Sequence, residues 1–131
     1  MLTYCPVFGV HYRICSPIKA PDSYFMSQDK EIKLSEFQGK KTILWLFSTW
    51  CHTCAAGVKA FAKRKDDFEK YNITLIALRN HKNGGYPGPS INEFIDHYVA
   101  NTELTKNWVI GETSKMMDKQ YNSIQYPDIF F

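Results

Sequence analysis

The chain has 131 residues, enough for one compact domain with a hydrophobic core and too few for two domains of ordinary size. Hydrophobic residues make up 44% of the sequence and charged residues 22%, and no apolar run is long enough to cross a bilayer, which argues against disorder and against a membrane-spanning helix. The net charge is only +3, and the densest basic cluster, residues 63–65, is followed at once by Asp66 and Asp67, as on a solvated helix face rather than a nucleic-acid-binding surface.

The start of the chain does not have the pattern of a signal peptide. Residues 1–16 lack a basic segment followed by an apolar one, and they hold Cys5 and His11 where a signal peptide would be apolar. We therefore predict an N-terminal extension over residues 1–15 and a single folded domain over residues 16–131. The chain as written is expected to be cytoplasmic, without a membrane anchor.

The first part of the domain is predicted to be a hairpin followed by a central strand. A polar turn at residues 28–30 separates two short strands, and a helical turn around residues 35–37 closes at Gly39. Residues 42–47 (Thr-Ile-Leu-Trp-Leu-Phe) are almost continuously apolar, β-branched or aromatic, which is typical of a strand buried on both faces. From Cys54 to Lys70 the apolar residues recur at helical spacing, so one amphipathic helix is expected there.

The rest of the chain continues the alternation of strands and helices. Residues 73–78 are predicted to be a second buried strand, parallel to the first. A long loop rich in Gly and Pro, residues 81–89, leads to a capping-box pattern at Ser90 and Glu93 that predicts the start of another helix. A third strand at residues 107–110, a short helix at 112–121 and the start of a strand at 126–131 complete the expectation of an α/β fold.

The pair Cys51-His52-Thr53-Cys54 lies where the first buried strand ends and the amphipathic helix begins. The N–H groups and dipole of a helix N-terminus stabilise a thiolate, so Cys51 is expected to have a lowered pKa and to be nucleophilic near neutral pH. Cys54, one turn further along, is expected to be shielded and able to attack a mixed disulfide formed on Cys51. The position of the pair therefore predicts dithiol-disulfide chemistry.

The cysteine pair is also compatible with a zinc site or with a purely structural role. A zinc site needs four ligands, and Cys5 and Cys15 do not form a second CxxC motif that would supply them, so we expect no metal. Two chemically inert core cysteines are the other alternative. His52, between the two sulfurs, either favours the thiolate and makes the disulfide more oxidising or is a polar residue at the helix start without electronic effect.

The run Phe47-Ser48-Thr49-Trp50-Cys51-His52-Thr53-Cys54 resembles the active site of the thioredoxin superfamily, nearest to its TlpA-like redoxin branch, and the segments 19–22 and 34–41 resemble that branch too. The resemblance implies a three-layer α/β/α fold with a mixed central sheet and no organic cofactor. It also implies exchange with protein thiols or disulfides and with an upstream electron donor or acceptor. The sequence ends before the last strand and helix of the family fold, so a sheet lacking them is expected.

Within this resemblance the pair Tyr126-Pro127 matches the family's cis-proline, which faces the cysteines. The resemblance implies that the backbone of Tyr126 pairs with a bound partner, and that Trp50 and His52 also contribute to substrate binding. Three positions depart from the family pattern. Gly57 and Lys59 stand where TlpA-like proteins often carry Glu and Pro, and Trp45 stands where thioredoxin itself has a buried Asp. No buried base is therefore expected to deprotonate Cys54.

Two rival functions are compatible with these residues. A peroxiredoxin-like thiol peroxidase would share the upstream elements, but it would need Pro and Thr at set positions before the reactive cysteine, and residues 47–50 do not supply them. A non-catalytic thioredoxin-like binding module would explain both the absent base and the early end of the chain. The TlpA-like relatives are often extracytoplasmic, which conflicts with the location expected from the chain as written.

Overall fold

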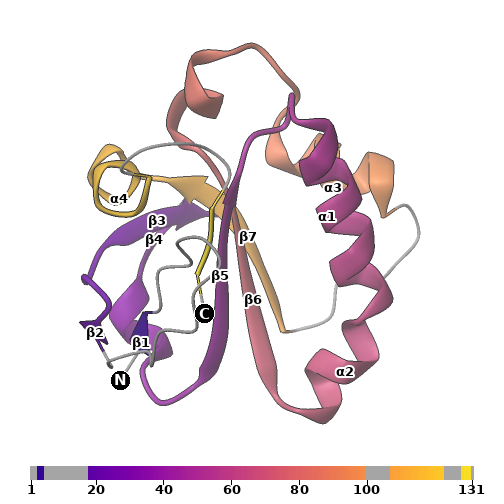
Figure 1. Ribbon diagram of the computed structural model, residues 1–131. Helices are drawn as coiled ribbons and strands as arrows, with labels where there is room; N and C mark the ends of the chain where they lie inside the picture. Colours follow the sequence, from indigo (N-terminus) through magenta and orange to yellow (C-terminus); the bar gives the residue numbers. More distant parts are fainter. Residues whose placement is uncertain (1–2, 5–17, 100–106, 123–127, 131) are drawn as a thin grey trace, which may run out of the picture.

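The computed structural model describes residues 3–4, 18–99, 107–122 and 128–130 and contains one mixed six-stranded sheet covered on both faces (Figure 1). The sheet order is β4-β3-β7-β6-β5-β8. Its strands are β3 (Tyr24–Ser27), β4 (Lys30–Lys33), β5 (Lys41–Phe47), β6 (Ile73–Arg79), β7 (Trp108–Thr113) and β8 (Asp128–Phe130). The helices are α1 (His52–Lys63), α2 (Lys65–Lys70), α3 (Ile91–Tyr98) and α4 (Lys115–Tyr121), with 3₁₀ turns η1 (Leu34–Phe37) and η2 (His81–Gly85).

The three central strands, β5, β6 and β7, run parallel, and the outer strands β3, β4 and β8 are antiparallel to their neighbours. This is the mixed sheet expected from the sequence. The β3-β4 hairpin turns through Gln28 and Asp29, which both have positive φ, as a two-residue hairpin connection requires. A separate short pairing joins β1 (Thr3–Tyr4) to β2 (Ile18–Lys19).

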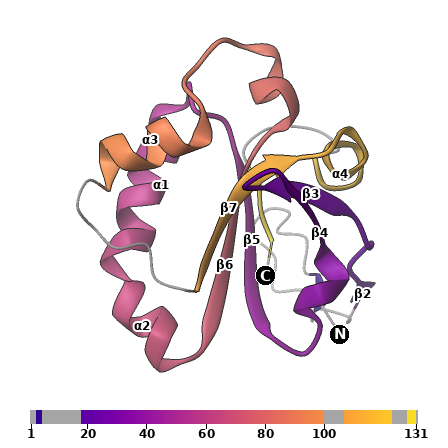
Figure 2. The same cartoon turned by 180° about the vertical axis from the view of Figure 1, so that it is seen from behind.

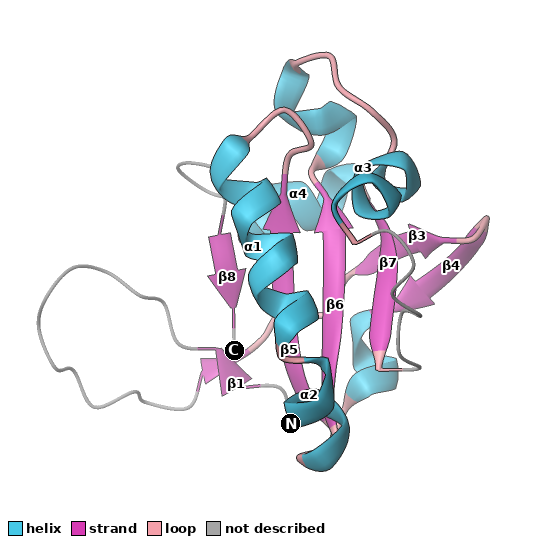
Figure 3. Cartoon of the chain, turned by 90° about the vertical axis from the view of Figure 1, so that its right-hand side faces the viewer, coloured by secondary structure: helices cyan, strands magenta, loops and turns pink. Residues whose placement is uncertain are grey.

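The core lies in two layers, because the side chains of β5 alternate between the faces of the sheet. Trp45 and Phe47 pack under α1, α2 and α3, whereas Leu44 and Leu46 pack on the opposite face with α4 and η1. Figures 2 and 3 show the corresponding arrangement, with α1, α2 and α3 on one side of the sheet and α4 on the other. The predicted three-layer fold and the doubly buried strands are therefore confirmed.

The helix predicted from Cys54 to Lys70 is wrong in two respects. It begins earlier, at His52, with Cys51 as the capping residue, and it is interrupted at Arg64, where α1 ends and α2 begins. Phe61 and Phe68 still pack against each other across the interruption, with ring centroids 6.0 Å apart. Because the apolar spacing is the same on both sides of the break, the sequence pattern could not reveal it.

The capping box predicted at the start of α3 is confirmed. The Ser90 hydroxyl accepts a hydrogen bond from the backbone N–H of Glu93, and the Glu93 carboxylate accepts one from the backbone N–H of Ser90 at 2.8 Å. Ser90 also fixes where the preceding loop ends, near the carboxyl ends of β5 and β6. Among the residues that the structure describes, no helix is long and apolar enough to cross a membrane.

Candidate active site

The cysteine pair lies at the carboxyl end of β5, in the turn that leads into α1. The backbone N–H of Cys51 donates to the Ser48 carbonyl at 3.2 Å, which closes a tight turn directly after the strand. The Cys51 carbonyl then accepts the first helical hydrogen bond, from Ala55 N–H. Cys51 is therefore the capping residue of α1, with its side chain beside the unpaired N–H groups of the first helical turn.

The two sulfurs differ in depth. Cys51 is partly exposed, whereas Cys54 is 1% exposed and belongs to the core cluster under α1. Both are free thiols in this structure. This is the difference in depth that the sequence predicted for a nucleophile and a resolving thiol.

The pKa values of the two thiols separate in the same sense. Burial raises the pKa of Cys51, but hydrogen bonds from the side chains of Cys54 and Thr53 and from their backbone amides outweigh it and bring this pKa below its ordinary value. Burial and the hydrogen bond with Cys51 raise the pKa of Cys54 to about 12, partly offset by a backbone hydrogen bond from Ser48. Cys51 is thus the thiol that ionises first.

Thr53 is a site residue that the sequence reasoning did not single out. Its Oγ1 lies 3.0 Å from the sulfur of Cys51, so the hydroxyl can donate a hydrogen bond to the thiolate. The signal was present in the sequence, since a hydroxyl two residues after a helix-capping cysteine lies in the first turn on the side of the sulfur.

Trp50, expected at the site, is 43% exposed next to Cys51. Its indole N–H donates to the backbone carbonyl of Asn83 at 2.8 Å, and its ring meets Tyr86 edge-on at 5.3 Å between centroids. Tyr86 is itself 63% exposed, so the two rings form an aromatic surface beside the cysteine. His52 is exposed as the first residue of α1, whereas Tyr126 and Pro127 lie outside the described residues.

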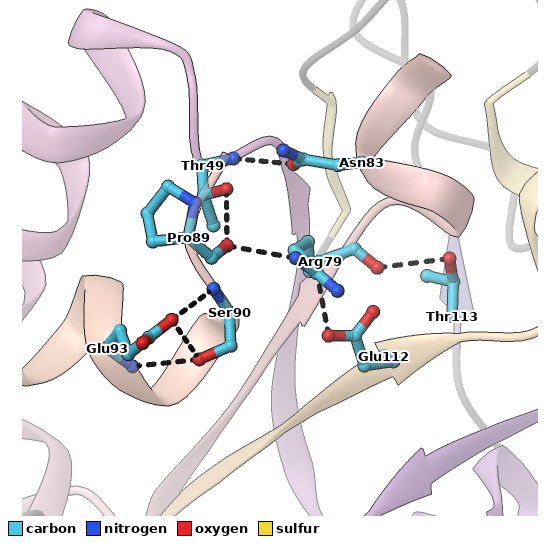
Figure 4. A network of polar contacts seen from close by, with 8 residues as sticks. All are labelled: Thr49, Arg79, Asn83, Pro89, Ser90, Glu93, Glu112 and Thr113. Carbon is cyan, nitrogen blue, oxygen red and sulfur yellow. Dashed lines mark hydrogen bonds and ion pairs between the residues drawn. The ribbon is translucent and has the colours of Figure 1, made fainter. Parts of the chain in front are cut away.

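The loop predicted at residues 81–89 packs against the turn before Cys51 (Figure 4). The Asn83 side chain accepts a hydrogen bond from the backbone N–H of Thr49 at 2.8 Å, and the Thr49 hydroxyl donates to the Pro89 carbonyl at 2.8 Å. Arg79, at the end of β6, also donates to the Pro89 carbonyl and forms an ion pair with Glu112 of β7. The loop is therefore attached to the cysteine turn at both Asn83 and Pro89, and to the sheet through Arg79.

A series of hydrogen bonds between polar side chains lies behind the same turn. The side-chain amide of Asn80 donates to the Ser48 hydroxyl at 3.0 Å, and Asn122, which follows α4, donates to the Asn80 side-chain carbonyl at 2.8 Å. Asn80 is completely buried. Residues from the ends of β5, β6 and α4 thus meet behind Cys51, although they are far apart in the sequence.

Gly57 and Trp45, two of the departures from the family pattern, lie against each other. A Cβ atom at Gly57 would be 2.8 Å from Cζ2 of Trp45, so the indole ring occupies the space that a side chain on this turn of α1 would need. In the described ranges the buried polar residues are Ser, Thr and Asn, with no Asp or Glu among them. Among those residues there is also no group of three or more His, Cys, Asp or Glu side chains that could hold a metal ion.

Solved structures with the same fold include several redox proteins. The chain is similar to a putative thiol:disulfide interchange protein DsbE from Chlorobium tepidum, with a TM-score of 0.62, 16% identity and coverage of 83% of this chain and 71% of that chain. It is similar to the thioredoxin domain of a thiol-disulfide oxidoreductase from Bacteroides vulgatus, with a TM-score of 0.64, 15% identity and coverage of 84% and 75%. It is also similar to a secreted Mycobacterium tuberculosis disulfide oxidoreductase, with a TM-score of 0.62, 16% identity and coverage of 83% of this chain and 75% of that chain.

At 15–16% identity these similarities show the fold alone. The site geometry shows, in addition, that the chain carries a dithiol. A thioredoxin-like sheet with a free CxxC pair at the start of its first helix defines a thioredoxin-like oxidoreductase. The AhpC/TSA family model matches residues 18–131, and the chain belongs to the AhpC/TSA family. The resemblance to the redoxin branch of the thioredoxin superfamily is thereby confirmed.

Proposed function

We propose that the protein catalyses thiol-disulfide exchange on protein substrates, with Cys51 as the nucleophile and Cys54 as the resolving thiol. The observation that carries this proposal is the contrast between the two sulfurs. The partly exposed sulfur of Cys51 has a lowered pKa at a helix N-terminus, and the buried sulfur of Cys54, one turn along, has a pKa of about 12. Such a pair offers one thiol that ionises more readily than an ordinary cysteine and holds the second one protonated until it is needed.

In the reducing direction the Cys51 thiolate attacks one sulfur of the substrate disulfide. A mixed disulfide forms, and the other substrate sulfur leaves as a thiolate, which takes up a proton from solvent. Cys54 then loses its proton and attacks the Cys51 sulfur, so that a Cys51–Cys54 disulfide forms and the second substrate thiol is released. Two electrons pass from the dithiol to the substrate, and the same steps in reverse oxidise a substrate dithiol.

The second step is expected to be the slower one. The Cys54 thiol is deeply buried and has a pKa of about 12, so its deprotonation is unfavourable at neutral pH. With Trp45 packed against Gly57, the position of the family's acidic group is filled by an apolar ring. Water that reaches the mixed disulfide is the proton acceptor we propose.

A protein substrate is supported by the surface around Cys51. Trp50, which directly precedes Cys51, and Tyr86, which contacts Trp50, both expose large aromatic areas, and the indole N–H of Trp50 is already used by Asn83. These exposed aromatic rings suit the side chains of a polypeptide better than a small polar disulfide. The roles of His52, Tyr126 and Pro127 in binding the substrate are part of this proposal and are supported by the resemblance.

Reduction of insulin with dithiothreitol as the electron donor tests the proposal. We expect turnover by the wild type and none by Cys51→Ser. When reduced Cys54→Ser is incubated with insulin after dithiothreitol has been removed, we expect a trapped mixed disulfide, visible as a mass increase that added dithiothreitol reverses. A folded wild type without turnover would favour a binding module instead. Consumption of hydrogen peroxide without insulin reduction would favour a thiol peroxidase.

A further inference from the structure

The segment around η2 has an unusual backbone. Lys82, Asn83, Gly84 and Gly85 have φ values of 47°, 56°, 69° and 88°, so four consecutive residues have a positive φ. For a residue with a side chain this region costs roughly 1–2 kcal/mol. Such a run persists only where the surrounding structure fixes it, and the contacts of Asn83 show what fixes it here.

Asn83 is 4% exposed and contacts the two residues that precede Cys51. Its side-chain carbonyl accepts a hydrogen bond from the backbone N–H of Thr49, and its backbone carbonyl accepts one from the indole N–H of Trp50, both at 2.8 Å. Its own backbone N–H donates to the carbonyl of Asn80, also at 2.8 Å. One residue therefore connects the end of β6 to the cysteine turn after β5.

The end of the same loop, at Gly88 and Pro89, packs against the contact between Asn83 and Thr49. A Cβ atom at Gly88 would lie 2.5 Å from the side-chain nitrogen of Asn83 and 2.7 Å from the hydroxyl oxygen of Thr49, so a residue with a side chain does not fit there. Next to Gly88, the Pro89 carbonyl accepts hydrogen bonds from both Thr49 and Arg79. Asn83 and the returning chain at Pro89 thus both bind Thr49, as Figure 4 shows.

We propose that Asn83 is a positioning residue for the dithiol. Asn83 fixes Thr49 and Trp50, so that the Cys51 sulfur stays beside the first turn of α1. Hydrogen bonds from backbone amides and from Thr53 favour the thiolate only while the sulfur remains beside them. Thr49 and Trp50 directly precede Cys51, so their positions determine where its sulfur lies. A fixed turn therefore keeps the sulfur reactive, and a loosened turn lets it move away from its donors.

The test uses Asn83→Gly, because glycine adopts the same positive φ and keeps the backbone N–H and carbonyl, so only the side-chain contact with Thr49 is lost. The matched control is Asn72→Gly. Asn72 has a φ of 52° and is exposed at the end of α2, so the control makes the same replacement in the same backbone conformation without touching the cysteine turn.

The measurement is the pH dependence of Cys51 alkylation by iodoacetamide in the full reduced chain, followed by peptide mass spectrometry so that each cysteine is read separately. For Asn83→Gly we expect the midpoint to rise by about half a pH unit or more, which corresponds to a roughly threefold lower rate below the midpoint. Asn72→Gly is expected to leave the midpoint where it is. An unchanged midpoint in a folded Asn83→Gly protein would overturn the proposal, even if its melting temperature fell.

A second variant guards against a folding defect. Gly88→Ala places a Cβ against Asn83 and Thr49, displaces the same loop from the other side and is expected to shift the midpoint in the same direction. The proposal shares the nucleophile with the proposed function, but it fails separately. If the midpoint shifts and insulin is not reduced, Asn83 positions the thiol and the protein-substrate function is wrong.

Discussion

At the scale of single residues, the chemistry depends on which groups contact the sulfur of Cys51. The thiol has hydrogen-bond donors on the first turn of α1, and one of them, the Thr53 hydroxyl, is a side chain that can be removed without disturbing the backbone. Because a hydrogen bond to a charged group stabilises it more strongly than one to a neutral group, Thr53 acts mainly on the thiolate.

We predict that Thr53→Val raises the pKa of Cys51 by up to about one unit, since the isosteric side chain fills the same space without the donor. The pH dependence of iodoacetamide alkylation measures this shift. Thr53→Ser, which keeps a hydroxyl, is the control and should leave the curve close to that of the wild type. Identical curves for the Val and Ser variants would show that the hydroxyl does not act on the thiolate.

At the scale of elements, α1 approaches β5 closely because Gly57 leaves room for the Trp45 ring. Trp45 also stacks on Phe47 at 4.4 Å and meets Phe61 at 5.0 Å, so it has little freedom to move aside. The contact is apolar at two positions where the resemblance led us to look for acidic residues. The helix that carries the cysteines is therefore held by packing on this side.

We predict that Gly57→Ala destabilises the protein by about 1–3 kcal/mol, because overpacking outweighs the gain in helix propensity of roughly 1 kcal/mol. Urea unfolding of the reduced protein measures the loss. Trp45→Phe is expected to relieve the clash, so the double variant should lose less stability than the two single losses added together. Additive losses would mean that residues 45 and 57 are not coupled.

The loop beside α1 belongs to the same scale, since it brings Tyr86 next to Trp50. We predict that Tyr86→Ala raises KM for insulin about threefold to tenfold, in line with the roughly 1 kcal/mol of an aromatic contact, and leaves reaction with the small disulfide of oxidised dithiothreitol unchanged. Tyr71→Ala is the control, because Tyr71 is also an exposed tyrosine (52%) but lies at the end of α2. Equal effects on both disulfides would place Tyr86 outside substrate binding.

At the scale of the whole molecule, the buried thiol links stability to pH. The pKa of Cys54 is about 12 in the folded protein and near 9 in an unfolded chain. Between these values the unfolded state has lost the proton and the folded state still holds it. Stability of the reduced protein therefore falls as pH rises above 9, and Cys51, whose pKa is lowered, adds no further slope in that range.

We predict a loss of unfolding free energy that approaches about 1.4 kcal/mol per pH unit above pH 9 from this one group. Urea unfolding of the reduced protein at several pH values measures the slope. Cys54→Ala removes the group, so its slope in the same range should be smaller by that amount, whatever its stability at neutral pH. Equal slopes for the two proteins would show that the Cys54 thiol ionises as easily when folded as when unfolded.

Local pattern predicted most of the elements, because their formation depends on neighbours in the sequence. The apolar runs indicated β5 and β6, and Ser90 and Glu93 indicated the start of α3 with the hydrogen bonds expected of them. The placement of Cys51 and Cys54 at the junction of strand and helix followed from the same periodicity. The difference in depth between the two sulfurs then needs only the geometry of one helical turn.

The amino-acid sequence by itself determined the α/β fold, the dithiol and the difference in burial between its two thiols, since these depend on spacing along the chain. Only the tertiary structure decided which side chains surround the dithiol. Asn83 lies 34 residues from Thr49, and the two meet only because the chain between them passes through β6 and a left-handed turn. Likewise, Trp45 and Gly57 read as two separate departures in the sequence, and the packing of α1 on β5 makes them one contact.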